Sequence, residues 1–395
     1  MNILILSFDF PPKLGGVANC AYNVAKELSS NHKNKVLVIA RKLEAIPKEN
    51  DDKILPENFN LKRVYLPKVA LFTVPFFMYH ILISIFSFRP SKILSMLWMP
   101  SGLSIFFLYP ILKIKKIKYY IYVHAVEVLE SSSSFKKIIR KLILGRLKKY
   151  VFKYAEKIIA VSNFTKDLVI KNCEVKDDNI EVINNGVDTN SFFIKTIDKN
   201  NTLKEISLKY PDALKLLTIS RLVPNKGIDT VLKACHILKQ QNVNFVYLIG
   251  GVGPDCNRLK KIVLDLNLED NVVFLNKLPE VELVDFYNWA DIYLLISRYD
   301  KEKPLVEGFG LVFLEAAACK TTSIGGDSGG IPDAISKESG LLVDPYDFES
   351  LAKQVSKLNK DRRLIDELSS NAYSRALNSF TWKIQVDRLN KILLR

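Results

Sequence analysis

The chain has 395 residues and a net charge of +15, with 48% hydrophobic and 25% charged residues. This length is too great for one small core and predicts two domains, and the composition is that of a globular protein without low-complexity tracts or internal repeats. The five cysteines are scattered and odd in number, which argues against a disulfide framework or a cysteine metal cluster and favours a reducing compartment.

The positive charge is concentrated in the first half of the chain. Residues 1–190 hold 29 Lys and Arg against 16 Asp and Glu (+13), and residues 191–395 hold 28 against 26 (+2). Such a basic half indicates nucleic acid, an anionic membrane surface or an acidic small substrate as partner, or simply a solvated surface. No basic stripe interleaved with aromatic residues forms a known nucleic-acid module, so we predict no nucleic-acid partner and keep a basic nucleic-acid-binding protein as an alternative.

The chain opens with a predicted βαβ unit. An apolar strand (1–7) leads through a Pro-Pro and Gly-Gly loop into a helix (17–28) and a second strand (35–40). The first loop of such a unit lies at the carboxyl edge of the sheet, so Gly16 is a candidate ligand contact. The apolar start has no basic leader, which predicts that no secretory signal is present.

Residues 69–88 and 93–112 are each about as long as a bilayer span and lack charged side chains. Pro75 interrupts the first stretch, and two prolines and a glycine interrupt the second. Arg89 and Lys92 lie between the two stretches. We therefore favour a buried helix, a strand at 92–96 and another helix over a transmembrane hairpin, although an integral membrane protein remains an alternative.

His124 follows the predicted strand 119–123, at the sheet edge where catalytic groups gather in doubly wound folds. A single histidine is more often structural. The helix predicted at 135–155 is amphipathic and basic, which fits either an anionic bilayer or a solvated face. Strands at 157–161 and 180–183 lead to the Asn-Gly turn at 185–186, where we place the domain boundary.

The second half repeats the strand and helix alternation. Strands are predicted near 214–219, 245–249, 272–275, 292–296 and 340–343, separated by helices and glycine-rich loops. This series predicts a second Rossmann-like domain, and residues 362–395 are predicted to be wholly helical.

The stretch EGFGLVFLEAAAC (307–319) is a glycine-rich entry into a helix. Backbone N–H groups at such a helix start favour an anion, and phosphate is the natural candidate. Glu307 and Glu315 would accept hydrogen bonds from sugar hydroxyls on either side of it. In the loop SRLVPNKG, Arg221 and Lys226 can neutralise a diphosphate without a metal, and no Asp-x-Asp or His/Cys ligand cluster is present.

Taken together, these motifs resemble those of the retaining glycosyltransferases of family 4, which have the GT-B fold. The similarity covers essentially the whole chain and rests on PPKLGGVAN, HAVE, VSN, INNGVDTNSF, SRLVPNKGID, FLNKLP, EGFGLVFLEAAAC and GGIPDAI. The motif EGFGLVFLEAAAC is especially similar to that of bacterial mannosyltransferases and polysaccharide-assembly enzymes. The loop before Glu307 is longer and more charged than is usual in the family.

The resemblance implies two Rossmann-like domains facing a central cleft, with a C-terminal helix crossing back. The expected acceptor domain is 1–187, completed by 371–395, and the donor domain is 188–370. The implied catalytic residues are His124, Arg221, Lys226 and Glu307. The implied donor-binding residues are Gly16, Arg221, Lys226, Asn276, Lys277, Leu278, Glu307, Gly308, Phe309, Gly310, Leu311, Val312, Phe313 and Glu315.

The resulting hypothesis is a metal-independent hexosyltransferase without a cofactor. It would use a UDP- or GDP-sugar, retain the anomeric configuration and extend a lipid-linked or cell-surface glycan. We expect it in the cytoplasm, peripheral on an anionic membrane surface through its basic N-terminal domain. A GT-B epimerase or a sugar-phosphate synthase is the alternative within the same fold.

Overall fold

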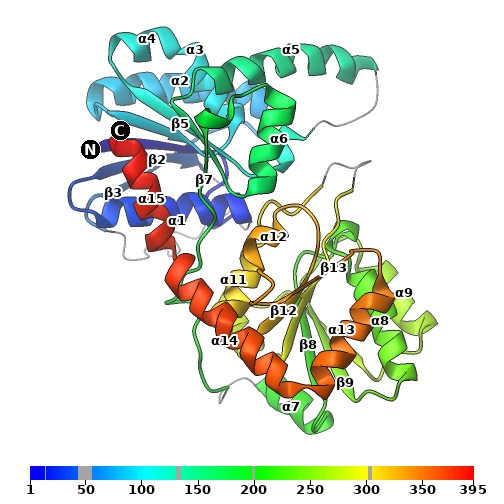
Figure 1. Cartoon of the computed structure of the whole chain (residues 1–395). Coiled ribbons are helices and arrows are strands. Elements are labelled where there is room, and N and C mark those ends of the chain that lie inside the picture. The colour runs from blue at the N-terminus through cyan, green and yellow to red at the C-terminus, as the bar shows by residue number, and fades with distance from the viewer. Residues whose placement is uncertain (14, 43–55, 130–134, 198–200, 301–304) are drawn as a thin grey trace. The chain divides into compact units, whose positions relative to one another are not determined.

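The computed structural model describes the chain except residues 14, 43–55, 130–134, 198–200 and 301–304, and for 135–143 it describes the backbone alone. The chain forms two compact parts, here called unit 1 (Met1–Asn185 with Trp382–Arg395) and unit 2 (Gly186–Thr381). Each is a parallel sheet with helices on its faces, which confirms the predicted α/β class with two Rossmann-like parts (Figure 1).

The sheet of unit 1 is built from short apolar strands. They are β1 (Asn2–Ser7), β2 (Lys35–Arg41), β3 (Phe59–Val64), β4 (Lys92–Ser95), β5 (Lys118–Val123), β6 (Lys157–Ala160) and β7 (Ile180–Val182). Their order is β3-β2-β1-β4-β5-β6-β7 and all pairs are parallel. The central strands are buried almost throughout, as expected for apolar runs that do not alternate with polar residues.

The helices of unit 1 are α1 (Gly16–Ser30), α2 (Ala70–Ser87), α3 (Leu103–Phe107), α4 (Tyr109–Ile114), α5 (Phe135–Lys153), α6 (Asn163–Cys173) and α15 (Trp382–Leu394). The predicted succession of helix, strand and helix over 69–112 is confirmed, but the second helix is divided. Trp98–Gly102 forms an irregular turn before α3 and α4, because Pro100 and Pro110 cannot continue a regular helix. Among the described residues, α2 is the one helix long and apolar enough to cross a bilayer, with a mean hydropathy of 1.8.

The sheet of unit 2 is formed by β8 (Leu214–Ile219), β9 (Phe245–Gly250), β10 (Val272–Asn276), β11 (Ile292–Leu295), β12 (Thr322–Gly326) and β13 (Leu341–Val343). Its order is β10-β9-β8-β11-β12-β13, again wholly parallel. The helices are α7 (Asn201–Lys209), α8 (Ile228–Gln240), α9 (Cys256–Asp265), α10 (Leu283–Trp289), α11 (Leu311–Ala318), α12 (Ile331–Ala334), α13 (Phe348–Lys360) and α14 (Arg362–Ser379).

The sequence predicted that residues 362–395 are wholly helical. This prediction is wrong, because the helix is interrupted between Ser379 and Trp382. Helix α14 ends at Ser379, and Val187 donates its N–H to the carbonyl of Phe380 (2.8 Å) while Thr381 forms a β-bridge with Val187. The chain leaves unit 2 at 381–382 rather than near 371, because α14 packs on α11 and β12 of unit 2. Helix α15 packs on α1 and belongs to unit 1.

Each sheet reverses its strand order once, between β1 and β4 in unit 1 and between β8 and β11 in unit 2. Loops diverge at such a switch point and leave a crevice at the carboxyl ends of the strands, where ligands bind in open α/β sheets. The predicted site residues of each unit follow strands at these edges.

Candidate active site

The edge of unit 2 brings Lys226 and Glu307 into direct contact. The ammonium Nζ of Lys226 donates to Oε2 of Glu307 at 2.6 Å, and both side chains are about four-fifths buried, with 18% and 21% of their surface exposed. Lys226 ends a 3₁₀ turn after β8, and Glu307 lies on the connection from β11 to α11. Residues that are 81 positions apart in sequence therefore form one charged pair beside the switch point.

The turn that carries Lys226 is held by Arg298, which the sequence reasoning did not identify. Its guanidinium donates to the carbonyl of Pro224 (2.8 and 3.1 Å) and pairs with Asp229 (2.7 Å), and its N–H donates to the carbonyl of Asn225 (2.9 Å). Burial acts to raise the pKa of Asp229, but Arg298 and Arg258 outweigh it and hold that pKa below its ordinary value. Arg298 thus positions Lys226 through its backbone.

Three glycines allow the loops of this edge to approach one another closely. A Cβ at Gly227 (φ +68°) would lie 1.9 Å from the carbonyl oxygen of Ile296, and one at Gly251 (φ +132°) would lie 1.8 Å from that of Ser220. A Cβ at Gly253 would meet the carbonyl oxygen of Leu222 at 2.1 Å. The loops after β8, β9 and β11 are therefore locked together around Arg221 and Lys226.

Arg221 lies at the start of the same loop with its side chain exposed. Within the described part of the chain, no acceptor is hydrogen-bonded to its guanidinium. Because Lys226 is paired and Arg221 is not, Arg221 is the cation here that can take up an anion without first losing a protein partner.

The start of α11 also fits an anion. Gly310 precedes the helix with φ +97° and no side chain caps it. The N–H of Phe313 donates to the carbonyl of Gly310 (3.1 Å), but the N–H groups of Leu311 and Val312 have no acceptor among the described residues. Of the predicted backbone donors, these two are available, whereas that of Phe313 is engaged.

The neighbours of α11 fix its start in place. Phe309 is buried and its ring lies 6.1 Å from that of Phe380, whereas Gly308 is only partly buried. The carbonyl of Glu307 accepts from the N–H of Gly330 (2.9 Å). These contacts hold the backbone at Glu307 and Phe309 in place.

Glu315 lies on α11 and is partly buried. The hydroxyl of Tyr287 donates to its Oε2 at 2.9 Å, and Tyr287 is itself fully buried. Burial raises the pKa of Glu315 to about 7, against the lowering effect of the Tyr287 hydrogen bond. Tyr287 is a second positioning residue that the sequence did not reveal.

The segment predicted to cradle the base is an exposed turn after β10. Asn276 (φ +56°) accepts from the N–H of Gly251 through its carbonyl (2.7 Å), and Lys277 is exposed. The side chain of Leu278 packs over Gly250, where an added Cβ would lie 2.8 Å from it. The structure thus brings this turn against the glycine-rich loop that supports Arg221.

In unit 1, His124 lies at the end of β5 in a strained turn. Its N–H donates to Oε1 of Glu127 (2.5 Å), and the next residue, Ala125, has φ +85°. The ring nitrogen Nε2 is buried without a partner in the described part of the chain. Burial lowers the pKa of His124 to about 4, despite a bond to the Met96 backbone, so the ring is neutral at pH 7.

Glu127 and Gly16 complete the edge of unit 1. Burial raises the pKa of Glu127 to about 7, partly offset by its bond to His124. Gly16 is exposed at the first turn of α1, behind Gly15 with φ +144°. The predicted roles of Gly16 and His124 toward the donor stay predictions.

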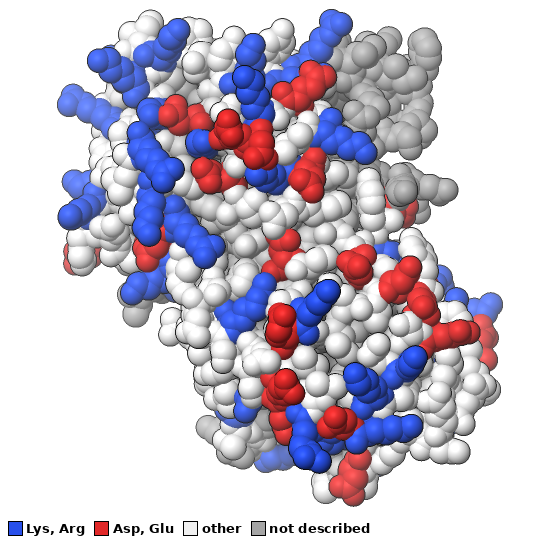
Figure 2. Space-filling view, viewed as in Figure 1, with Lys and Arg blue, Asp and Glu red and all other residues white. Residues whose placement is uncertain are grey.

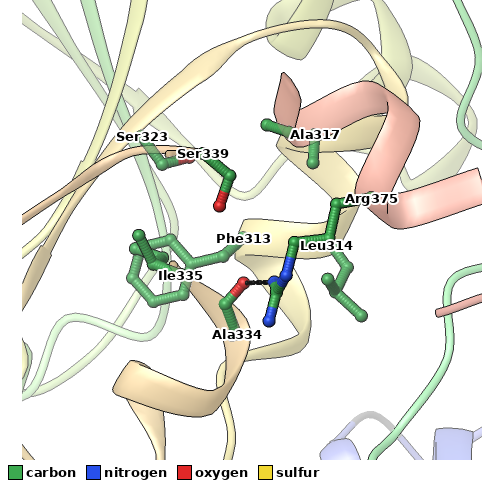
Figure 3. Close-up of a pocket in the computed structure, with 9 residues that line it drawn as sticks. Phe313, Leu314, Ala317, Ser323, Ala334, Ile335, Ser339 and Arg375 are labelled. Carbon is green, nitrogen blue, oxygen red and sulfur yellow. Dashed lines mark hydrogen bonds between the residues drawn. The ribbon is translucent and has the colours of Figure 1, made fainter. Parts of the chain in front are cut away.

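A small pocket in unit 2 is lined in part by α11, and neither Lys226 nor Glu307 is among its lining residues. It is lined by residues of α11, α12 and α14, and Arg375 there donates to the carbonyl of Ala334 (2.5 Å; Figure 3). Its volume of about 10 Å³ has room for roughly one water molecule. Among the described residues, no group of three or more His, Cys, Asp or Glu side chains is placed to hold a metal ion.

Two parallel α/β units with ligand-type loops at their switch points match the architecture of the GT-B glycosyltransferases. Residues 199–375 match the family model "Glycosyl transferases group 1", and residues 14–191 match "Glycosyltransferase Family 4". The chain therefore belongs to glycosyltransferase family 4.

Individual relatives are similar over parts of the chain. The GDP-mannose-dependent alpha-(1-6)-phosphatidylinositol monomannoside mannosyltransferase of Mycolicibacterium smegmatis is 31% identical over 179 residues, which cover 45% of this chain and 47% of that protein. Mannosylfructose-phosphate synthase of Agrobacterium fabrum is 30% identical over 242 residues, 59% of this chain and 51% of that one. The chain thus spans about half the length of these relatives.

The fold is also similar to that of solved structures over its whole length. Sucrose-phosphate synthase from Thermosynechococcus elongatus aligns with a TM-score of 0.79 and 21% identity, over 100% of this chain and 98% of that one. This likeness shows the GT-B fold.

Proposed function

We propose that the protein is a retaining, metal-independent hexosyltransferase that moves a hexose from a UDP- or GDP-sugar to a lipid-linked or cell-surface glycan. The observation that supports it most is the contact between Lys226 and Glu307 beside an unpaired Arg221 and an open helix start. Cations next to a carboxylate match a substrate with a diphosphate on one side and sugar hydroxyls on the other.

In this proposal the cations act on the leaving group. Breaking the bond between the anomeric carbon and the diphosphate oxygen places negative charge on the diphosphate. Arg221, Lys226 and the first N–H groups of α11 stabilise that charge most when the bond is breaking, which is when stabilisation accelerates the reaction.

Donor binding exchanges the partners of the ion pair. Lys226 turns from Glu307 toward the diphosphate, and Glu307 accepts hydrogen bonds from hydroxyls of the transferred sugar. Glu315, held by Tyr287, accepts from the ribose. Each charged group leaves one partner and gains another, so neither charge is left unpaired in a largely buried place.

Transfer with retention follows from the family resemblance. The acceptor hydroxyl oxygen bonds to the anomeric carbon on the face from which the diphosphate departs, and its proton passes to the departing phosphate oxygen. Exclusion of water favours this transfer over hydrolysis. We place the enzyme in the cytoplasm at an anionic membrane surface, where a lipid-linked acceptor is available.

A second candidate is a sugar-phosphate synthase, favoured by the 30% identity to mannosylfructose-phosphate synthase. An acceptor comparison separates the two. The full chain is incubated with radiolabelled UDP- and GDP-hexoses, and with either a membrane lipid extract or soluble sugar phosphates. Label that enters the lipid phase, with an α-linkage from an α-donor by NMR, supports our proposal. Label that enters only a sugar phosphate, or an inverted linkage, contradicts it.

A further inference from the structure

The outer surface of α2 carries a continuous row of exposed apolar side chains. Its members are spaced alternately three and four residues apart, which places them on one face of the helix. They are Val69 (52% exposed), Phe72 (65%), Phe76 (40%), Tyr79 (61%), Ile83 (36%) and Phe86 (66%). A soluble helix normally presents polar residues on this side, so the row needs an explanation.

The opposite face of α2 is fixed in the core of unit 1. Val74, Phe77, Ile81 and Ile85 are buried in the cluster that surrounds β1 and β4. The sequence prediction of a buried helix is therefore correct for one face only. Since the inner face is occupied by protein, α2 lies along the surface of unit 1.

Two neighbouring segments extend the apolar row. The ring of Tyr65, which is 69% exposed, lies 6.1 Å from that of Phe76. At the other end, Nζ of Lys115 lies 5.7 Å from the ring centre of Phe86, so the end of α4 borders α2. Ile114, 79% exposed, lies beside Lys115 in sequence. We call this set, with the row on α2, the apolar face.

The segment that carries the apolar face contains positive charges and no negative ones. From residue 58 to residue 126 the sequence contains nine Lys and Arg and no Asp or Glu. Lys68 precedes α2, and Lys113, Lys115 and Lys116 lie at the end of α4. Figure 2 shows Lys and Arg along the upper left edge of unit 1, near the place of α4 in Figure 1.

We infer that the apolar face docks on an anionic lipid bilayer, with α2 in the plane of the interface. Exposed aromatic and aliphatic side chains would enter the headgroup region, and the lysines that border them would contact anionic headgroups. Such an interface favours Phe and Tyr beside Lys, and residues 58–126 supply these without an Asp or Glu of their own. This assignment rests on the proposed membrane-linked acceptor and names the surface that reaches it.

The test is co-flotation of the full chain with vesicles of phosphatidylcholine alone or mixed with phosphatidylglycerol. We compare wild type with a Phe72→Ser/Phe86→Ser variant. Leu208→Ser is the matched control, because Leu208 is 82% exposed on α7 of unit 2. We expect wild type and control to float with the anionic vesicles, and the double variant to lose at least about tenfold in partitioning, as removal of two buried aromatic rings implies.

Three outcomes would overturn the inference. They are no flotation of wild type with anionic vesicles, undiminished flotation of the double variant, and a dimer that the double variant converts to a monomer while flotation is unchanged. Nucleotide binding is measured on the same samples. Its retention in a variant that no longer floats separates loss of docking from unfolding. Flotation without nucleotide binding in wild type would contradict the proposed function and leave the docking surface intact.

Discussion

Units 1 and 2 share one strand order around their switch points but present opposite chemistry there. In unit 2 the groups are charged: Lys226 pairs with Glu307 at 2.6 Å, beside an exposed Arg221. In unit 1 they carry less charge, since burial lowers the pKa of His124 to about 4 and raises that of Glu127 to about 7. The fold therefore fixes where a ligand can bind, and the side chains decide which kind.

The difference also concerns how each edge is supported. In unit 2, glycines and Arg298 lock the loops after β8, β9 and β11 together. In unit 1, one carboxylate holds the strained turn after β5 through the backbone of His124. In the proposed function, the ionic groups of unit 2 suit a charged donor, and the less charged edge of unit 1 suits sugar hydroxyls.

The largest expected effect is on turnover through the cations of unit 2. Arg221→Ala and Lys226→Ala should each lower the transfer rate by about 100- to 1,000-fold, because each removes a donor to the charge that develops on the diphosphate. Initial rates at saturating donor measure this. The control is Lys261→Ala, an exposed lysine on α9. Rates within a few-fold of wild type in both variants would refute the charged edge as the catalytic one.

The second effect is on stability through Gly227. Gly227→Ala should lower the free energy of unfolding by about 3 kcal/mol, because the Cβ would overlap the carbonyl of Ile296 and the residue has positive φ. Urea unfolding measures the change. Gly145→Ala is the control: nothing lies within 4 Å of its Cβ, and alanine in helix α5 should stabilise by up to about 1 kcal/mol. If the Gly227 variant unfolds with the same free energy as wild type, the loops of unit 2 rearrange at little cost to make room for the Cβ.

The third effect is a pH dependence that belongs to Glu127 in unit 1. Its pKa is raised on folding, so its contribution to stability is present below pH 4.5 and is lost as the pH rises through about 7. Between pH 5 and 7.5 this amounts to about 2 kcal/mol. Glu127→Gln should remove that part of the decline, as followed by urea unfolding at each pH.

Glu174→Gln serves as the control for this pH series, because Glu174 is exposed and forms a surface pair with Lys149. An unchanged slope in the Glu127 variant would mean that the carboxyl titrates as it does in water. The account of a less charged edge in unit 1 would then fail.

The smallest effect concerns Tyr287 in unit 2. Tyr287→Phe should weaken nucleotide binding at pH 7 by roughly fivefold, because one hydrogen bond to Glu315 is worth about 1 kcal/mol and its loss raises the carboxyl pKa further. Titration calorimetry measures it, with Tyr210→Phe as the control, whose hydroxyl has no partner in the described part of the chain. If both variants bind alike, Tyr287 does not position Glu315.

The sequence predicted the fold well because its signals are local. Apolar strands and glycine-rich loops define the two α/β series, and the strand predicted near 214–219 coincides with β8. The motif with Glu307 and Glu315 was recognised for the same reason. The break at Phe380 was missed, because it depends on a bridge to Val187 from the other end of unit 2.

Features that depend on tertiary distances were not predictable. Arg298 and Tyr287 act on Lys226 and Glu315 across 72 and 28 positions of sequence, and no local pattern marks them. The apolar face was not predicted, because residues 69–88 are hydrophobic all round and their pattern does not show which side of α2 is exposed. The basic helix 135–155 was the sequence's candidate for a membrane surface, but the side chains of 135–143 lie outside the described residues.

The most direct test of the central claim is a calorimetric titration of UDP, GDP and ADP, without added metal, into wild type, Lys226→Ala and Lys261→Ala. We predict that one nucleotide binds wild type and the Lys261 variant equally and binds the Lys226 variant at least about tenfold more weakly, as loss of a charge-assisted contact implies. Equal binding to all three proteins, or no binding to wild type, would contradict a diphosphate site built on Lys226.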